Sequence, residues 1–361
     1  MKYYVISGET SGDQHASKVI QTLNKLDSKA EFRGMGGNES KNAGQHLVLH
    51  QKEMAIMGIW EVIVNRRKIS KNLTKIKKDI VFWKPDAIVL VDYPGFNFKI
   101  AKFANRLQIP VHYYISPKVW AWKENRVELI RKYVTQLYCI LPFEKDYFSK
   151  KGIEITYVGN PSKEAVEDYK LKSPAPQQNK YIALLPGSRA QEIRTALPIM
   201  LEAIKDYKEY NVLIAQAPGF TDEYYHAFGE NLTLIKEDLY SLLSKSKVAL
   251  VTSGTATLET ALMGIPQVVC YKMNRLSYEI GKRIIKLKYI SLVNLILDKP
   301  SVTELIQDEF NINKIRTKLN LILHNEEEQA RIKNDYLQLN NLLGDVKPSQ
   351  RVANEIYQSL T

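Results

Sequence analysis

Cysteine is scarce in this chain, and long apolar stretches are missing. The 361 residues include two cysteines, Cys139 and Cys270, and neither belongs to a CxxC motif or a Cys/His cluster. This pattern indicates buried free thiols and argues against a disulfide framework or a structural zinc site. No apolar run approaches the roughly 18 residues that span a bilayer, and the first predicted strand follows Met1 without a signal-peptide pattern. We therefore expect a cytoplasmic protein.

Several catalytic motifs are absent as well. The first glycine turn, 8-GETSGD-13, has neither the GxGxxG spacing of a dinucleotide site nor the ending of a P-loop. The chain contains no G-x-S-x-G nucleophile elbow and no Asp-x-Asp pair placed to hold Mg²⁺. His46 and His50 stand four residues apart, but the alternating apolar residues around them favour a strand over a metal-binding helix face. We expect no metal and no cofactor.

Basic residues outnumber acidic residues, and the net charge is +12. Such a charge favours a polyanionic partner: nucleic acid, an anionic membrane surface or phosphorylated substrates. Residues 66–78 carry seven basic groups and no acid, directly after the apolar-rich stretch 54–64, and residues 272–288 carry six basic groups and one acid. No nucleic-acid-binding motif accompanies these clusters, so we expect no nucleic acid partner.

Two interpretations of the first cluster remain open, namely a patch that contacts an anionic membrane surface and a solvated helix face. The predicted membrane patch consists of Met57, Ile59, Trp60, Ile63, Arg66, Arg67 and Lys71.

The length and the order of the apolar segments predict two α/β domains. A composition of 45% hydrophobic and 25% charged residues is typical of a globular protein, and strand-like runs that end in glycine, proline or polar turns alternate with helical patterns. This rhythm stops in a segment rich in Pro, Gln and Lys and restarts at residue 181. We predict a Rossmann-like domain over 1–168, a linker over 169–180, a second Rossmann-like domain over 181–340 and a helical tail over 341–361.

Carboxylates stand at two strand ends of the first half. The buried strand within 86–98 leads into Asp92 and a Pro-Gly break. An ionised carboxylate at this place costs free energy unless it is solvated, paired with a cation or required for catalysis. Asp92 is therefore the first candidate for a general base, with helix capping as the open alternative. The turn after the first strand offers Glu9, Ser11 and Asp13 at the edge where α/β folds place their ligands.

The second half is organised around residues 248–273, which predict a strand, a small-residue turn, a helix and a second strand. The turn 253–257 has no bulky side chain, so its N–H groups can approach a phosphate at the helix start; close packing is the alternative. Glu259 either binds a ribose diol or simply complements the helix dipole. Arg189, after a Leu-Pro-Gly-Ser turn, suits the neutralisation of a diphosphate without a metal.

Several stretches carry a family resemblance. In chain order they are 8-GETSGD-13, 54-MAIMGIWEV-62, 91-VDYPGFN-97, 112-HYYISPKVWAW-122, 141-LPFEK-145, 158-VGNP-161, 184-LLPGSRAQE-192, 253-SGTATLE-259, 268-VVCYKM-273 and 289-YISLVNLI-296. With them the chain resembles the GT-B class of glycosyltransferases and, more specifically, the lipid-A-disaccharide synthase family. The resemblance spans nearly the whole chain, and the SPKVWAW and SGTATLE blocks are specific. The implied fold is GT-B, with two facing Rossmann-like doubly wound domains.

The sequence departs from the family pattern at four positions: Thr10 replaces Ala, Gly95 replaces an acid, Asn160 replaces His, and Val293 replaces Pro. The change at position 95 removes the second carboxylate near Asp92, and the change at 293 loosens the assignment of Asn294.

The resemblance implies an inverting reaction that joins UDP-2,3-diacylglucosamine to 2,3-diacylglucosamine 1-phosphate, forming a β(1→6)-linked lipid A disaccharide phosphate and UDP. Asp92 would deprotonate the acceptor 6-hydroxyl, and Glu9 would help to position the substrate. The implied acceptor-side residues are Ser11, Gly12, Asp13, Asn97 and Asn160. The implied UDP-binding residues are Gly187, Ser188, Arg189, Glu192, Ser253, Gly254, Thr255, Ala256, Glu259, Tyr271 and Asn294.

The resemblance also implies a peripheral enzyme on the inner membrane of a Gram-negative bacterium, and a homodimer formed by exchange of C-terminal elements. Two other functions remain open at this point. A UDP-N-acetylglucosamine epimerase would share the nucleotide loops, and a non-catalytic nucleotide-binding or membrane scaffold protein would share the charge pattern. Asp92 at a strand end favours an enzyme.

Overall fold

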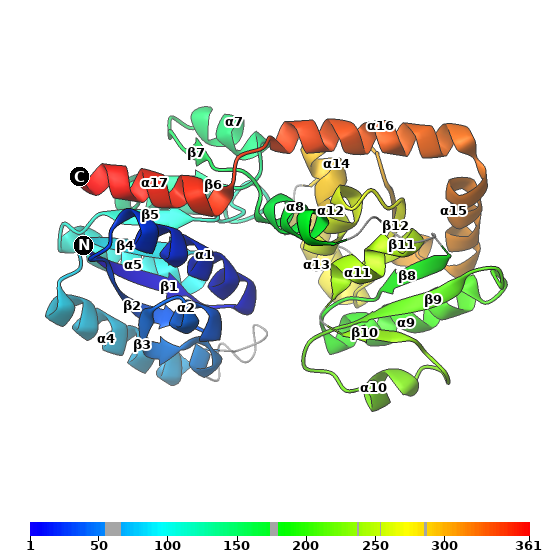
Figure 1. The fold of residues 1–361 in the computed structure, drawn as a ribbon, viewed down its shortest axis with the longest axis horizontal. Helices are drawn as coiled ribbons and strands as arrows, with labels where there is room; N and C mark the ends of the chain where they lie inside the picture. The colour runs from blue at the N-terminus through cyan, green and yellow to red at the C-terminus, as the bar shows by residue number, and fades with distance from the viewer. Residues whose placement is uncertain (55–65, 174–179, 237, 253, 285–286) are drawn as a thin grey trace. The chain divides into compact units, whose positions relative to one another are not determined.

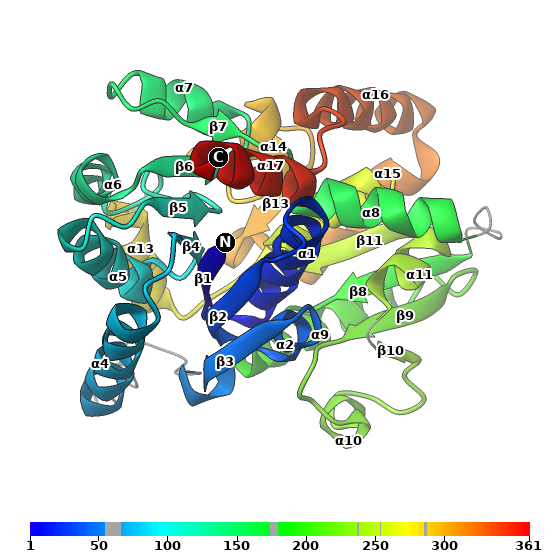
Figure 2. The same ribbon diagram turned by 60° about the vertical axis from the view of Figure 1, so that its left-hand side comes forward.

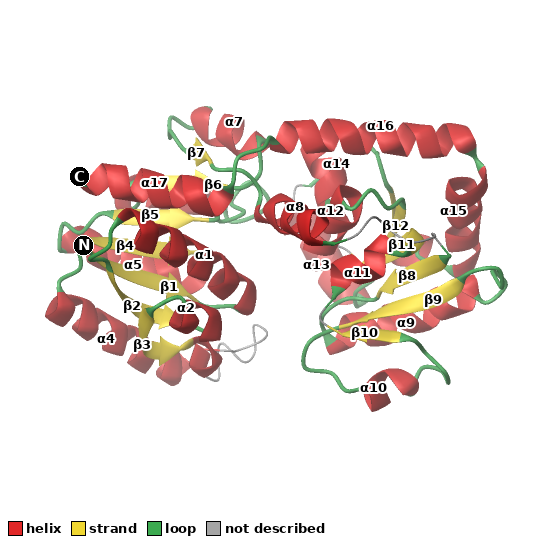
Figure 3. Ribbon diagram, viewed as in Figure 1, coloured by secondary structure: helices red, strands yellow, loops and turns green. Residues whose placement is uncertain are grey.

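The computed structural model describes residues 1–54, 66–173, 180–236, 238–252, 254–284 and 287–361. The chain divides into two compact units: unit 1 comprises Met1–Pro161 and Asp345–Thr361, and unit 2 comprises Ser162–Gly344. Each unit has its own parallel β-sheet with helices on both faces (Figures 1 and 3). None of the described helices combines the length and apolar character needed to cross a bilayer.

The sheet of unit 1 has the strand order β3-β2-β1-β4-β5-β6-β7, and every pairing is parallel. Its strands are β1 (Lys2–Ser7), β2 (Glu31–Gly36), β3 (Gln45–His50), β4 (Ala87–Val91), β5 (Val111–Tyr114), β6 (Gln136–Cys139) and β7 (Thr156–Tyr157). The order reverses between β1 and β4, which is the topological switch point where doubly wound folds bind ligands. β4 is buried along its whole length, which explains its purely apolar sequence.

Helices cover both faces of this sheet. On one face α1 (Thr10–Leu26) and α17 (Pro348–Leu360) pack against each other (Figures 1 and 2). On the other lie α4 (Arg66–Trp83), α5 (Pro94–Arg106) and α6 (Val127–Tyr133). The side chains of β1 alternate between the two faces. Tyr3 and Val5 share a core with α1 and α17, whereas Tyr4 and Ile6 share one with α4 and α5. The shorter helices are α2 (Asn38–Asn42), α7 (Phe143–Ser149), η1 (Gln51–Met54) and η2 (Glu124–Arg126).

The basic segment 66–78 lies in α4, which is amphipathic. Ile76 and Ile80 are buried in the core, whereas Arg67 and Lys71 are exposed. Asp79 fixes the helix to the sheet, since its carboxylate accepts hydrogen bonds from the guanidinium of Arg33 at 2.7 and 2.8 Å and from the hydroxyl of Tyr4 at 2.9 Å. The apolar members of the predicted membrane patch, Met57, Ile59, Trp60 and Ile63, lie outside the described residues.

The sheet of unit 2 has the order β10-β9-β8-β11-β12-β13 and is also parallel. Its strands are β8 (Tyr181–Leu185), β9 (Asn211–Gln216), β10 (Leu234–Lys236), β11 (Ser246–Thr252), β12 (Gln267–Tyr271) and β13 (Thr303–Ile306). Its helices are α8 (Pro161–Lys172), α9 (Ala190–Ile204), α10 (Asp222–His226), α11 (Leu239–Ser244), α12 (Thr255–Leu262), α13 (Arg275–Ile284), α14 (Leu292–Leu297), α15 (Ile312–His324), α16 (Glu326–Leu343) and the short η3 (Gln307–Glu309). The switch point lies between β8 and β11, so both units are doubly wound, as the sequence predicted.

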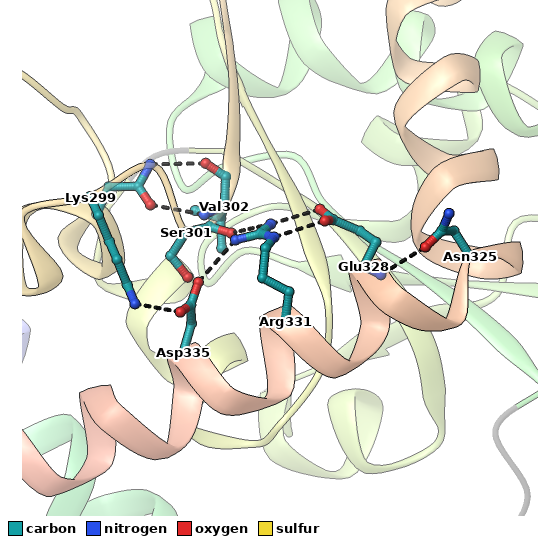
Figure 4. Close-up of polar contacts among 8 residues, drawn as sticks. Lys299, Ser301, Val302, Asn325, Glu328, Arg331 and Asp335 are labelled. Carbon is teal, nitrogen blue, oxygen red and sulfur yellow. Dashed lines mark hydrogen bonds and ion pairs between the residues drawn. The ribbon is translucent and has the colours of Figure 1, made fainter.

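A polar network fastens α16 to the rest of unit 2 (Figure 4). Arg331 donates to both carboxylate oxygens of Glu328 at 2.7 and 2.8 Å, to Asp335 at 2.9 Å and to the main-chain carbonyl of Ser301 at 3.1 Å. Lys299 pairs with the other oxygen of Asp335 at 2.5 Å. Because Asp335 is only 4% exposed, its charge needs these two cations.

The chain crosses between the units twice. It enters unit 2 between Pro161 and Ser162 and returns between Gly344 and Asp345. Residues 169–172, where the sequence predicted the start of a linker, continue α8, and residues 174–179 lie outside the described part of the chain. α17, within the predicted tail, belongs to unit 1, where Val352, Ala353 and Ile356 are buried. Exchange of this tail in a dimer stays a prediction.

Candidate active site

The loops that follow β1 and β4 meet at the switch point of unit 1. Gly8 begins the first loop, and Tyr93 belongs to the second. A Cβ atom at Gly8 would lie 2.4 Å from two carbons of the Tyr93 ring, so only glycine fits at this position. The loops that contain GETSGD and VDYPGFN therefore pack directly against each other.

Asp92 is held in an unusual backbone conformation. Its φ is 46° and that of Tyr93 is 50°, in the left-handed region that non-glycine residues rarely adopt. The main-chain carbonyl of Asp92 accepts the Tyr113 hydroxyl at 2.6 Å and the amide Nδ2 of Asn97 at 2.7 Å. Such strain, of order ~1–3 kcal/mol per residue, persists only where surrounding contacts enforce it. Asn97, predicted to lie on the acceptor side, is one of those contacts.

The carboxyl group of Asp92 has a raised pKa. Burial and, next, the negative charge of Glu9 raise this pKa to about 6, whereas Lys118 and the backbone N–H of Tyr93 act in the opposite direction. A carboxyl group with such a pKa is mostly ionised at neutral pH and accepts a proton more readily than an ordinary aspartate. The assignment of Asp92 as a general base stays a prediction; the charge of Glu9, which is exposed at the N-cap of α1, contributes to the raised pKa of Asp92.

Asp13 has a different environment from Asp92. Its side chain is buried, with a relative exposure of 2%. Its carboxylate accepts the main-chain N–H groups of Gly37 at 2.7 Å, Glu39 at 3.0 Å and Ser40 at 3.2 Å. These donors belong to the start of α2, where helices leave N–H groups without internal partners. The carboxylate is therefore occupied within unit 1, and a role for Asp13 in substrate binding stays a prediction.

The other predicted acceptor-side residues surround this centre at different depths. Ser11 is exposed, and Gly12 is buried at the start of α1. Asn160 is 3% exposed, and its Nδ2 donates to the carbonyl of Ile140 at 3.0 Å. A Cβ atom at Gly95 would meet nothing within 4 Å, so packing does not require glycine at this position.

In unit 2 the loop after β8 leads into α9, and a carboxylate of the protein itself, that of Glu192, already bonds its N–H groups. Gly187 has a φ of 110°, and a Cβ atom there would lie 2.6 Å from Glu192. Glu192 folds back over this glycine and accepts the main-chain N–H groups of Ser188 at 2.9 Å and Arg189 at 3.2 Å. The N–H groups and the dipole of a helix start stabilise negative charge. Here the carboxylate of Glu192 provides that charge, and the guanidinium of Arg189, 77% exposed, lies 3.6 Å from it.

The loop after β11 lies next to the loop after β8. Of the predicted turn, Ser253 lies outside the described residues, Gly254 and Thr255 are exposed, and Ala256 is half-buried. Gly254 has a φ of 135°, a value that requires glycine. The hydroxyl of Thr252 donates to the carbonyl of Leu185 at 2.7 Å, which ties the ends of β11 and β8 together.

Glu259 is half-buried on α12 and is already hydrogen-bonded. Its Oε1 accepts the hydroxyl of Tyr240 at 3.1 Å. Burial raises its pKa, and the hydrogen bonds from Tyr240 and Ser162 oppose that effect. A ribose diol would have to share this carboxylate with Tyr240.

Asn294 is 1% exposed, and the fold uses its whole amide. Its Nδ2 donates to the carbonyl of Val302 and to Glu304, both at 2.9 Å, and its Oδ1 accepts the N–H of Val302 at 2.9 Å. Asn294 thereby fastens α14 to the start of β13. Tyr271, at the end of β12, is half-buried, and its hydroxyl lies 3.5 Å from the sulfur of Met273.

A cavity that the sequence analysis missed lies at the carboxyl ends of β12 and β13. Its volume is about 490 Å³, and Gln191 and Thr195 of α9 line one side. Lys272, Asn274 and Gln307 are among the residues that line the rest. The last residues of the VVCYKM stretch line this cavity, so that stretch could have indicated it in the sequence. The size and the polar lining suit a small polar ligand.

The cysteine and histidine expectations can be compared with the structure. Cys139 and Cys270 are free and buried, as predicted. His46 and His50 lie on β3, the edge strand of its sheet, which confirms the strand interpretation. Within the described ranges, no group of three or more His, Cys, Asp or Glu side chains is arranged to hold a metal ion.

Comparison with known proteins identifies the family. The family model described as lipid-A-disaccharide synthetase matches residues 3–356. The chain belongs to the lipid-A-disaccharide synthase family. Members of this family are glycosyltransferases, which implies a sugar-nucleotide donor and a lipid-linked acceptor.

Individual relatives match the chain over nearly its full length. The lipid-A-disaccharide synthase of Syntrophus aciditrophicus is 34% identical over 364 residues, covering 97% of this chain and 95% of that protein. The enzyme of the same name from Geobacter metallireducens is 32% identical over 370 residues, covering 99% of this chain and 96% of that protein.

Solved structures confirm the GT-B fold class. A UDP-GlcNAc 2-epimerase from Methanocaldococcus jannaschii superposes with a TM-score of 0.67 at 16% identity, covering 99% of this chain and 100% of that one. The calicheamicin glycosyltransferase CalG4 gives a TM-score of 0.62 at 16% identity, covering 99% and 97%. At such identities the likeness shows the fold alone, so the epimerase alternative is not favoured over the family assignment.

The two roles considered for Asp13 can be separated by measuring stability. Asp13→Ala removes the acceptor for three main-chain N–H groups, two of them buried, so we expect the free energy of unfolding to fall by about 1–3 kcal/mol, as measured by urea denaturation. Ser11→Ala, at an exposed position of the same loop, should change it by less than about 0.5 kcal/mol. Unchanged stability of Asp13→Ala would show that its carboxylate does not support the fold.

Proposed function

We propose that this chain transfers 2,3-diacylglucosamine from UDP-2,3-diacylglucosamine to 2,3-diacylglucosamine 1-phosphate, forming lipid A disaccharide 1-phosphate and UDP. The observation that carries this proposal is the strained turn at the switch point of unit 1, which presents Asp92 with a raised pKa. In a family of lipid-A-disaccharide synthases, a carboxylate at this position can accept the proton of the acceptor hydroxyl. A sugar hydroxyl must lose its proton to become a nucleophile.

The proposed chemical step is a single displacement. The 6-hydroxyl oxygen of the acceptor attacks C1 of the donor sugar, and the bond between C1 and the diphosphate breaks. Asp92 takes the hydroxyl proton, and UDP leaves with the bonding electron pair. Because attack occurs opposite the leaving group, an α-linked donor gives a β(1→6)-linked product.

The nucleotide is proposed to bind at the switch point of unit 2. The N–H groups of Ser188 and Arg189, now bonded to Glu192, suit a diphosphate, and the exposed guanidinium of Arg189 would turn from Glu192 toward it. Together with the starts of α9 and α12, they would stabilise the charge that develops on the leaving group. Glu259 is proposed to share its carboxylate with the ribose. The fully bonded amide of Asn294 supports an indirect role for this residue, in positioning the neighbouring chain.

The donor sugar is proposed to occupy the cavity of about 490 Å³. This cavity begins at Gln191, beside the proposed diphosphate site on α9, and Lys272 and Asn274 offer polar groups for sugar hydroxyls. A pyranose ring with its substituents fits a cavity of this size.

Both proposed substrates carry acyl chains, so the enzyme must collect them from a bilayer. We propose a peripheral association of unit 1 with the anionic inner membrane. The support is the exposed basic face of α4, which includes Arg67 and Lys71. The apolar residues between 54 and 64 precede this face in the sequence.

A product assay tests the reaction and its base together. Wild-type protein incubated with synthetic donor and acceptor lipids should yield the disaccharide 1-phosphate and UDP, identified by mass spectrometry. Asp92→Asn keeps the shape but removes the proton acceptor, so turnover should fall by about 10²-fold or more with unchanged UDP affinity. Interconversion of free UDP-sugars without a lipid product would contradict the reaction, and near-normal turnover of Asp92→Asn would exclude this base.

The nucleotide site is tested by UDP binding. Arg189→Ala should weaken UDP affinity by roughly tenfold or more, because a charge-assisted bond to a phosphate contributes about 1.5 kcal/mol at least. Isothermal titration calorimetry provides the measurement. Arg194→Ala, within the helix that Arg189 precedes, is the matched control, since that guanidinium bonds the hydroxyl of Tyr224. Equal UDP affinity of the two variants would remove Arg189 from the site.

Vesicle binding tests the membrane proposal. Each basic residue near an anionic surface contributes about 1 kcal/mol, and salt screens the attraction. The triple charge reversal Arg67→Glu, Lys71→Glu and Lys75→Glu should therefore release the protein from phosphatidylglycerol vesicles in a sedimentation assay. The control reverses three exposed lysines of unit 2, Lys208, Lys245 and Lys333. If both triple variants sediment like the wild type, α4 is only a solvated helix.

A further inference from the structure

Two segments of the cavity wall in unit 2 are joined by one side chain. Gln307 lines the cavity and follows the last residue of β13. Its Oε1 accepts the main-chain N–H of Met273 at 2.8 Å, and its Nε2 donates to the main-chain carbonyl of the same residue at 3.2 Å. Met273 lies two residues beyond the end of β12 and also lines the cavity. A single carboxamide therefore uses both its donor and its acceptor to fasten one part of the wall to the other.

These two bonds continue the ladder between β12 and β13. The strands pair in parallel as far as Tyr271 and Ile306, so residues 272 and 307 would form the next pair. Gln307 has a φ of 55°, which lies outside the strand region, so its main chain turns away from β12. A primary amide carries the same kinds of donor and acceptor as a peptide group. The side chain of Gln307 thus replaces the missing main-chain pair and extends the connection by two residues.

The backbone of Gln307 is strained, and the turn that follows holds it in place. Its main-chain carbonyl accepts the N–H of Phe310 at 3.2 Å, and Phe310 is 1% exposed. A non-glycine residue pays free energy for a left-handed conformation, which persists only where surrounding contacts enforce it. Glycine would adopt this φ without strain, but glycine has no carboxamide to bond Met273. An unfavourable backbone is therefore combined here with a side chain whose bonds glycine cannot make.

The segment that Gln307 fastens carries several polar groups of the cavity. Lys272 and Asn274, on either side of Met273, are exposed and line the cavity. The main-chain carbonyl of Asn274 accepts the N–H of Tyr278 at 3.0 Å in the first turn of α13, and Tyr278 lines the cavity as well. The bonds to Met273 therefore fix the main chain from which these three side chains project.

We propose that Gln307 is a positioning residue of the donor-sugar site, because its carboxamide holds residues 272–274 where Lys272 and Asn274 meet the sugar hydroxyls. Groups that are held in place before binding lose less conformational entropy when the ligand arrives, which raises affinity. The two bonds of Gln307 act on the sugar part of the donor and leave the nucleotide part, at the starts of α9 and α12, unaffected. This inference rests on the proposed function, which assigns the cavity to the donor sugar.

Steady-state kinetics of disaccharide formation tests the proposal. Gln307→Gly removes the carboxamide and relieves the backbone strain, whereas Gln307→Ala removes the carboxamide and keeps the strain. Both variants should raise KM for UDP-2,3-diacylglucosamine by about fivefold or more, the size of effect that one lost hydrogen bond produces. Since the sugar contacts act on the bound donor and on the transition state alike, kcat should change less than KM. The acceptor KM, and the UDP affinity measured by calorimetry, should stay within about twofold of wild type.

Gln329→Ala is the matched control. Gln329 is a half-buried glutamine of α16, and its Nε2 donates to the main-chain carbonyls of Ile322 and Leu323 at 2.9 and 3.0 Å. Its replacement also removes two side-chain bonds to the main chain of unit 2, but Gln329 is not among the described residues that line the cavity. The donor KM of this variant should equal that of the wild type. A purely structural role for Gln307 would lower stability or turnover in both glutamine variants without raising the donor KM in either.

The outcomes also distinguish this inference from the proposed function. Absence of the disaccharide product with wild-type protein contradicts the reaction itself. Product formation by the wild type together with an unchanged donor KM in Gln307→Gly and Gln307→Ala contradicts only the role of Gln307. An equal loss of UDP affinity would overturn that role too, because the effect would then lie on the nucleotide. Since glycine suits the backbone at this position, Gln307→Gly is expected to fold normally, which circular dichroism can verify.

Discussion

The left-handed turn at Asp92 and Tyr93 is the constraint on which unit 1 depends. The chain leaves a fully buried strand and must reverse at once, and the main-chain carbonyl of Asp92 is fixed there by Tyr113 and Asn97. The ring of Tyr93 then occupies the space that any side chain at Gly8 would need. One strained turn thereby joins the loops of two strands and leaves a carboxyl group partly buried, which is the origin of its raised pKa.

The two units share one topology, but their switch-point loops present different chemical groups. Each reverses its strand order beside its first strand, and a closely packed glycine lies in the loop after that strand, Gly8 in unit 1 and Gly187 in unit 2. In unit 1 the turn presents a carboxylate. In unit 2 the turn presents main-chain N–H groups and an arginine, and Glu192 already occupies those N–H groups as an anion. The proposed function assigns a proton acceptor to one unit and an anion site to the other, and a transfer from a nucleotide sugar requires both.

The sequence predicted the strand ends well, because buried parallel strands are apolar and their loops begin with glycine, proline or a charged residue. Asp92 and the turn at Gly187 follow from that pattern alone. Hydrogen-bond partners could not be predicted in the same way, since Asp13 bonds a main-chain group 24 residues away and Asn294 bonds the chain across a turn, in the segment before β13. Gln307 illustrates the same difficulty, because nothing in the sequence showed that its carboxamide would bond the main chain of Met273.

The most direct test of the central claim is an NMR titration of the Asp92 carboxyl carbon in the wild-type protein, assigned by comparison with Asp92→Asn. The strained and partly buried turn predicts an apparent pKa near the value of about 6 that burial and Glu9 produce. An apparent pKa near the ordinary aspartate value of 3.8 would mean that the turn does not prepare this group to accept a proton, and would contradict the account.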